Sequence, residues 1–327
     1  MTHDLDELRR SHPAPHDITL SPLHRARLGS RVDLAIDRHE ARRRVVRGIA
    51  GPATVLACAT AVATVAVLAL TGDSPAPRPE ATRAVMTSVA ATRVLDGAAD
   101  RALASPAPTV REDQFVYTRS AVITNEGRLG EGVVLGPVHE RETWLGQDPG
   151  PFGWQDDVIR ELGQDWPLES GGPSPAGARR PTYAWLAQLP TDPDALLDVL
   201  DRAAAPVDGQ EQQQATFELI GTLVSEQLVP PDTAAALFRA VTRIDGIEVE
   251  RGATDALGRR GIGITRSDAR FHTRTTWIFD PSTYELRGTR WFFTHANGSP
   301  DTLFGATAVL ETDVVDRAGQ VPGSHAG

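Results

Sequence analysis

The stretch that most constrains the fold of this chain is residues 48–72, GIAGPATVLACATAVATVAVLALTG, which carries no charged side chain. As a helix rising about 1.5 Å per residue it would be roughly 37 Å long, whereas the hydrocarbon core of a bilayer is about 30 Å thick. A helix packed on a soluble core usually shows a polar face, but the polar groups of this run are four threonines, which can bond back to their own helix. The run therefore predicts a membrane-spanning helix.

The charges on the two sides of this run predict its orientation. Arginines crowd the preceding side, and the residues expected to orient the helix are Arg42, Arg43, Arg44 and Arg47. On the other side Asp73 comes first, and Arg78 is balanced by Glu80. Because positive flanks stay in the cytosol, we expect a single-pass protein of the cell membrane with a cytosolic N-terminus and an extracytoplasmic C-terminal part.

Two other interpretations of the run are open. A cleavable signal peptide has a short charged segment and about 7–15 apolar residues, whereas 47 residues precede this longer run, with cleavage then expected near residues 70–72. The tetrapeptide from Val55 to Cys58 loosely resembles a lipidation motif, although mostly apolar residues follow it. Cys58 is the only cysteine, so the rest of the chain has no disulfide, no thiol chemistry and no cysteine-based zinc site.

Aromatic residues locate the folded domain. All 18 of them lie between Phe115 and Phe304, which places the core within residues 112–317. Residues 1–47 hold ten arginines against seven acidic residues, whereas residues 73–327 hold 23 arginines against 36 acidic residues. Since an acidic domain lacks the basic face that phosphates require, we expect no nucleic acid among its partners.

Composition divides the chain into a cytosolic Arg-rich arm (1–47), a transmembrane helix (48–72), an extracytoplasmic Pro-rich spacer and helix (73–111), an extracytoplasmic α+β domain (112–317) and a flexible tail (318–327). In the arm, Ser21 and Pro22 favour the start of a helix. An apolar stripe on that helix consists of Leu28, Val32 and Ile36. The stripe indicates either an anchor on membrane lipid or a docking surface for a cytosolic partner.

The order of strand and helix signals predicts the fold class of the domain. Strands are expected at 114–123 and 138–146, followed by an irregular region with a turn of helix near 158–162. Three helices follow, beginning at Asp192-Pro193, near 211 and after Pro230-Pro231. Strands return at 248–251, 261–265, 274–280, 284–293 and 307–315, with a hairpin turn at Asp280-Pro281-Ser282-Thr283. This order predicts an α+β domain with an antiparallel sheet packed on helices.

The sequence carries none of the familiar motifs of nucleophilic hydrolases, nucleotide-binding loops or zinc proteases. His139 and Arg141 fall on one face of a strand and Glu140 and Glu142 on the other, which we interpret as a solvated strand. An acidic cluster without the EF-hand pattern consists of Asp156, Asp157 and Glu161. We therefore predict no catalytic, cofactor-binding or metal-binding residues and no enzyme activity.

Several segments occur together in an order typical of a known family. They are the Arg-rich arm, the Ala/Val-rich run, DQFVY (113–117), LPTDP (189–193), IFDPSTYEL (278–286) and VVDRAG (314–319). Through these segments the chain resembles a large actinobacterial family of single-pass membrane proteins of unassigned biochemical function. The resemblance extends over nearly the whole chain. Members are often encoded beside extracytoplasmic-function sigma factors, which implies a regulatory role like that of an anti-sigma factor. The chain departs from many anti-sigma domains in lacking their His/Cys zinc motif, and its arm is short for a full sigma-binding domain.

Two functions follow from these observations. The first is a membrane-anchored envelope sensor or regulator, whose outer domain binds something and whose arm or span reports inward to a cytosolic sigma factor or another regulator. The second is an anchored ligand- or lipid-binding module of the cell envelope with no signalling role. The predicted topology and the family resemblance favour the first function, whereas a concave apolar face on the sheet would favour the second.

Overall fold

The computed structural model of the 327-residue chain describes residues 79–128, 132–150, 157–167, 175–206, 209–295 and 299–323. The predicted arm and the predicted membrane span lie outside these ranges. Among the helices within them, none combines the length and the apolar character that a membrane crossing requires.

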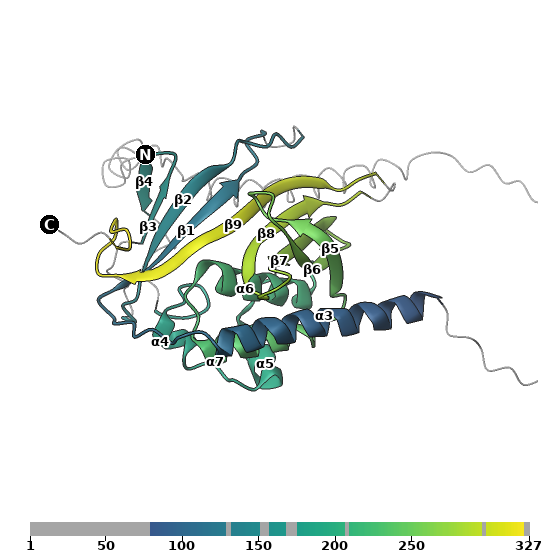
Figure 1. The fold of residues 1–327 in the computed structure, drawn as a ribbon, viewed down its shortest axis with the longest axis horizontal. Helices are drawn as coiled ribbons and strands as arrows, with labels where there is room; N and C mark the ends of the chain where they lie inside the picture. The colour runs from purple at the N-terminus through teal and green to yellow at the C-terminus, as the bar shows by residue number, and fades with distance from the viewer. Residues whose placement is uncertain are drawn as a thin grey trace, which may run out of the picture.

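Within the described residues the framework is a nine-stranded antiparallel sheet of order β4-β3-β2-β1-β9-β8-β7-β6-β5 (Figure 1). The strands are β1 (Phe115–Ile123), β2 (His139–Gly146), β3 (Val158–Glu161), β4 (Gln164–Pro167), β5 (Glu248–Thr254), β6 (Arg260–Asp268), β7 (Thr273–Phe279), β8 (Leu286–Phe293) and β9 (Thr302–Val315). The helices are α3 (Pro79–Leu103), α4 (Tyr183–Leu186), α5 (Pro193–Ala203), α6 (Gln212–Glu226) and α7 (Pro231–Val241).

The chain builds the sheet in two halves. Strands β1 to β4 form one meander, the chain then makes helices α4 to α7, and strands β5 to β9 form a second meander. The halves join where β9 pairs with β1, with Phe115 opposite Val315 and Ile123 opposite Ala306. This arrangement confirms the predicted α+β class and the antiparallel sheet packed on helices.

Local sequence signals explain several of these elements. The Asp192 side chain accepts a hydrogen bond from the Ala195 amide at 2.9 Å, which caps α5 as predicted. Pro231 occupies the first turn of α7, where the missing N–H has no partner to lose. The predicted hairpin around Asp280 joins β7 to β8.

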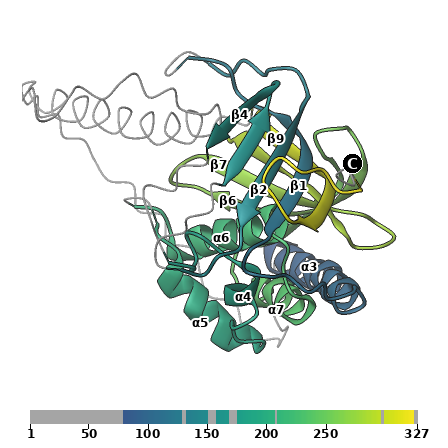
Figure 2. The same cartoon turned by 90° about the vertical axis from the view of Figure 1, so that its left-hand side faces the viewer.

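The main core lies between the helices and the β5–β8 half of the sheet, and the helices gather on one side of the sheet in Figure 2. Phe217 of α6 stacks on Trp277 of β7, with ring centroids 4.1 Å apart. Gly221 permits this approach, because a Cβ there would lie 2.6 Å from the indole nitrogen of Trp277. Helix α3 belongs to the same core, since Leu95 and Ala99 are fully buried in it.

A second, smaller core lies across β1, β2 and β9. Its buried residues are Phe115, Tyr117, Trp144 and Val315. The segment after β9 covers them, because Ala318 packs on this cluster and the Trp144 indole donates a hydrogen bond to the Gln320 carbonyl at 2.7 Å. The first residues of the predicted tail thus pack against the sheet.

The predicted turn of helix near 158–162 is wrong, because Val158–Glu161 forms β3 and pairs with β2. Leu162 and Gly163 have φ values of 53° and 75° and form a two-residue hairpin turn between β3 and β4. Such a turn requires positive φ at both central positions, which glycine adopts readily and leucine rarely does. The Leu-Gly pair therefore gave a weak hairpin signal in the sequence.

Candidate functional site

The turn between β7 and β8 is stabilised by one carboxylate. Asp280 Oδ1 accepts hydrogen bonds from the Ser282 hydroxyl at 2.6 Å, the Ser282 amide at 2.7 Å and the Thr283 amide at 2.9 Å. These donors, with the Ser282 hydroxyl foremost, hold the pKa of Asp280 well below its usual range. The three hydrogen bonds fix the conformation of the turn, and the next two side chains, Tyr284 and Glu285, face α3.

Tyr284 makes the contact between this turn and α3. Its backbone has a φ of 57°, in the left-handed region, and its ring packs against Gly97 of α3. A Cβ at position 97 would lie 2.6 Å from Tyr284 Cδ2, so the glycine is required for the fit. Glu285 and Arg101 form an ion pair at 4.0 Å, but both side chains are exposed and the pair contributes little. Steric fit, rather than charge, fixes α3 on the turn.

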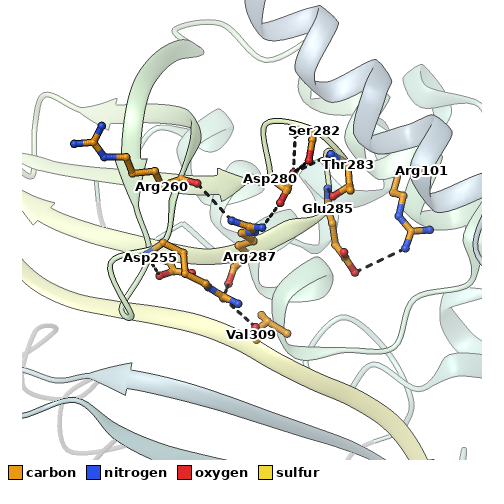
Figure 3. A network of polar contacts seen from close by, with 10 residues as sticks. Arg101, Asp255, Arg260, Asp280, Ser282, Thr283, Glu285, Arg287 and Val309 are labelled. Atoms are coloured by element: carbon orange, nitrogen blue, oxygen red, sulfur yellow. Dashed lines mark hydrogen bonds and ion pairs between the residues drawn. The ribbon is translucent and has the colours of Figure 1, made fainter.

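Arg287 connects the turn to the sheet, as Figure 3 shows. Its guanidinium forms an ion pair with Asp280 and donates a hydrogen bond to the Arg260 carbonyl at 3.4 Å. Its own carbonyl accepts a hydrogen bond from the Arg259 guanidinium at 3.3 Å. Arg259 also donates to the Val309 carbonyl of β9 at 3.2 Å. One series of polar contacts thus runs from the β7–β8 turn to β9.

The turn between β5 and β6 provides Arg259 and lies beside β9, just past the point where the ladder between β8 and β9 ends. The pairing of β8 with β9 ends at Arg290, and the Thr307 carbonyl beyond it accepts a hydrogen bond from the Ala256 amide at 3.3 Å. The buried carboxylate of Asp255 shapes this turn by accepting from the Leu257 amide at 2.9 Å and from both the amide and the guanidinium of Arg259. Beyond Arg290 the β5–β6 turn therefore donates to carbonyls of β9, while the Thr289 amide of β8 donates to the Thr307 hydroxyl at 3.1 Å.

Together these contacts connect three parts of the domain. The Asp280–Glu285 turn holds α3, Arg287 and Arg259 link that turn to the β5–β6 turn, and the β5–β6 turn holds β9 (Figure 3). The hydroxyl of this set that meets a carboxylate is that of Ser282, and its partner Asp280 is a weak base because its pKa is lowered. The arrangement is a continuous series of contacts from β9 to α3, and we call it the α3–β9 linkage.

A second polar cluster lies in the other half of the sheet. Glu161 of β3 is fully buried, and its Oε1 accepts hydrogen bonds from Arg141 at 2.8 Å and from His139 Nε2 at 2.7 Å. The other ring nitrogen of His139 lies 3.0 Å from the Pro137 carbonyl oxygen. The interpretation of this face as solvated is therefore wrong for Arg141, which lies opposite Glu161 and is buried. His139 is half-buried and reaches Glu161 from the first position of β2.

This cluster is incompletely satisfied. In the described part of the chain, three buried atoms near one another on β1, β2 and β3 have no hydrogen-bond partner: Thr118 Oγ1, Arg141 Nε and Glu161 Oε2. One N–H donor and two oxygen atoms are thus left without a hydrogen-bond partner. A water molecule or a small polar group would supply the missing hydrogen bonds. We call Thr118, His139, Arg141 and Glu161 the Glu161 cluster.

The opposite face of the same strands carries a row of ion pairs. Glu142 lies 3.5 Å from Arg160 and accepts a hydrogen bond from the Tyr117 hydroxyl at 2.7 Å. Burial, followed by this hydrogen bond, raises the pKa of Tyr117. Arg119 pairs with Glu140 and Glu311 across the neighbouring strands. On this face Glu140 is exposed, as the interpretation of a solvated strand predicts. Glu142 is partly buried, so the prediction fits it less well.

A third polar group fastens α6 to the sheet. Arg266 of β6 donates hydrogen bonds to Gln214 of α6 at 2.6 Å, to Glu211 at 2.9 Å and to the Asp245 carbonyl at 3.0 Å. Gln214 in turn donates to Glu218, whose pKa is raised chiefly by burial. These contacts explain how a charged strand residue is buried beneath a helix.

The sequence-predicted site residues lie mostly outside the described ranges. These are the orienting arginines Arg42, Arg43, Arg44 and Arg47 and the docking stripe Leu28, Val32 and Ile36. Of the acidic cluster, Asp156 is also outside them, Asp157 accepts a hydrogen bond from the Gly146 amide at 2.6 Å, and Glu161 binds Arg141 and His139. Among the described residues no group of three or more His, Cys, Asp or Glu side chains is placed to hold a metal ion.

Comparison with known proteins adds no relative to this description. No family model, no curated protein and no solved structure matches the chain.

Substitution of Gly97 tests the fit between α3 and the β7–β8 turn. We expect Gly97→Ala to lower the free energy of unfolding by about 1–3 kcal/mol, because the new methyl group overlaps the Tyr284 ring. In a Tyr284→Gly background the overlap is gone, and the same change should stabilise α3 by up to about 1 kcal/mol through helix propensity. Urea unfolding of the four proteins measures this, and an equal effect of Gly97→Ala in both backgrounds would contradict the contact.

Substitution of Glu161 tests the Glu161 cluster. Glu161→Gln removes the charge that compensates buried Arg141, so we expect a loss of roughly 3–5 kcal/mol in unfolding free energy. The matched control is Asp165→Asn, which removes a carboxylate from the largely exposed pair with Arg160 and should cost less than about 1 kcal/mol. Thermal unfolding compares the two variants, and similar small losses in both would show that the cluster is not buried.

Proposed function

We propose that this chain is a single-pass, membrane-anchored envelope protein that acts as a sensor or regulator. Residues 48–72 cross the membrane, the arm lies in the cytosol and the α+β domain is extracytoplasmic. The charge asymmetry of the flanks and the resemblance to the actinobacterial single-pass family support this topology. The outer domain receives the signal, and the arm meets a cytosolic sigma factor or another regulator.

The observation that carries the sensor proposal is the position of α3. This helix begins six residues after the apolar run, and its C-terminal half is part of the main core of the domain. Val94, Leu95 and Ala98 are buried there, and Tyr284 holds Gly97. A rearrangement in the sheet would therefore move α3 and, through it, the segment that enters the membrane.

The spacer between the run and α3 supports this coupling. Residues 73–78 include Pro75 and Pro77, and α3 itself starts with Pro79. A Pro-rich segment is extended and stiff, whereas a Gly/Ser-rich segment would let the domain move independently of the span. The α3–β9 linkage extends the same connection to the strand that joins the two halves of the sheet.

The second candidate is an anchored ligand-binding module with no signalling role. The unpartnered buried atoms of the Glu161 cluster favour it, because they offer hydrogen bonds to a bound group. Their polarity favours a small polar ligand over the acyl chain of a lipid. A sensor also needs a ligand, so this observation fits both functions, and only the behaviour of the arm separates them.

Capture of partners by the arm tests the signalling role. The full chain, purified from native membranes after cross-linking, should recover a sigma factor or another cytosolic regulator. The matched control carries Leu28→Asp, Val32→Asp and Ile36→Asp, which removes the apolar stripe and should abolish recovery. Recovery of no regulator by the natural arm, together with a small molecule bound to the domain, would favour the second function instead.

A further inference from the structure

Apolar side chains gather at one end of the sheet. In the connection between β1 and β2, Val134, Leu135 and Val138 are 58%, 43% and 48% exposed. At the far end of the β8–β9 hairpin lie the half-buried residues Trp291, Phe292, Phe293, Leu303 and Phe304. We call these eight residues the apolar end. Soluble proteins seldom leave such side chains grouped at a surface without a partner.

The strand register places both groups at the same end. Ile123, the last residue of β1, lies opposite Ala306, and Leu135 forms a bridge with Asn125 just beyond it. Phe292 lies opposite Leu303, and the rings of Phe293 and Phe304 stack with centroids 4.4 Å apart. The β1–β2 connection and the β8–β9 hairpin therefore extend beyond the sheet in the same direction, to the right in Figure 1.

The N-terminal end of helix α3 points toward this end of the sheet as well. Gly97 is held by Tyr284 at the other end of β8, and the helix extends from there back to Pro79, about 27 Å at 1.5 Å per residue. In Figure 1 the beginning of α3 and the β8–β9 hairpin both lie at the right-hand end of the domain, and the β1–β2 connection turns above the sheet, to the left of them. Six residues separate Pro79 from the apolar run, a segment that can span at most about 22 Å.

We propose that the apolar end of the domain rests on the outer surface of the lipid bilayer. The inference depends on the proposed membrane anchoring, and it adds an orientation: the domain lies against the membrane instead of standing away from it. A short tether that leaves from this end keeps the apolar residues near the lipid. Tryptophan and other aromatic residues are enriched at the level of lipid headgroups, and exposed aliphatic side chains gain free energy by entering the apolar boundary.

Charge contributes little to this contact. Arg274 stacks over Phe292 at 4.1 Å, but it is already paired with Glu250 at 2.7 Å and with Asp301 at 2.8 Å. The contact therefore depends on apolar burial, and neutral phosphatidylcholine suffices for it. This separates the proposal from the attraction of a basic patch to anionic lipid, which weakens with salt.

Depth-dependent quenching in vesicles tests the proposal. The full chain with Cys58→Ser is reconstituted into phosphatidylcholine vesicles, and a fluorophore is attached either to Leu135→Cys at the apolar end or to Leu103→Cys at the opposite end of α3. Both are exposed leucines, at 43% and 44%, so neither change disturbs the core. We expect lipids that carry a nitroxide near the headgroup to quench the Leu135→Cys label severalfold more strongly than the Leu103→Cys label, with or without high salt.

Equal quenching at the two positions, or no quenching of the Leu135→Cys label, overturns the proposal. Self-quenching between Leu135→Cys labels without quenching by lipid would assign the apolar end to a second copy of the chain and also overturn it. Carbonate extraction of the same vesicles tests the membrane anchoring separately from the orientation of the domain. If the chain stays in the vesicles while the label is not quenched, only the orientation is wrong; if the chain is released, the anchoring and the orientation are both wrong.

Discussion

The pairing of β1 with β9 is the interaction on which the rest of the structure depends. Phe115 lies opposite Val315, 200 positions later in the chain, and all the helices from α4 to α7 and seven strands lie between them in the described sequence. Apart from single contacts such as the hydrogen bond from the Tyr183 amide of α4 to Gln147, this pairing is what joins the first meander to the second meander and its helix layer. Long-range pairing of this kind is slow to form, because the entropy of closing a large loop is lost before the contacts are gained.

The same pairing gives β9 a special place in the proposed function. On one side β9 joins the half of the sheet that contains the Glu161 cluster, and on the other it accepts hydrogen bonds from the β5–β6 turn. From that turn, Arg259 and Arg287 lead to the turn that holds α3. In the proposed sensor, these contacts are the route by which a ligand bound in the first half of the sheet acts on α3.

Much of this fold was predictable from sequence, and the failures have physical causes. Asp192 as a cap and Asp280 as the start of a hairpin turn act through neighbouring residues, so their patterns are visible in the chain. The Glu161 cluster was missed because its pairs depend on a hairpin turn at Leu162, a residue that rarely adopts positive φ. The α3–β9 linkage was missed because a charged turn appears solvated in sequence until distant strands enclose it, and Arg259 gave no local signal of its contact with Val309.

The membrane topology is the central claim of this account, and labelling in intact cells tests it most directly. In a Cys58→Ser background, a membrane-impermeant maleimide should modify Leu257→Cys, which lies 48% exposed in the β5–β6 turn, before the cells are permeabilised. Ser11→Cys in the arm should react only after permeabilisation. Labelling of Ser11→Cys in intact cells, or protection of Leu257→Cys until the membrane is opened, would contradict the account.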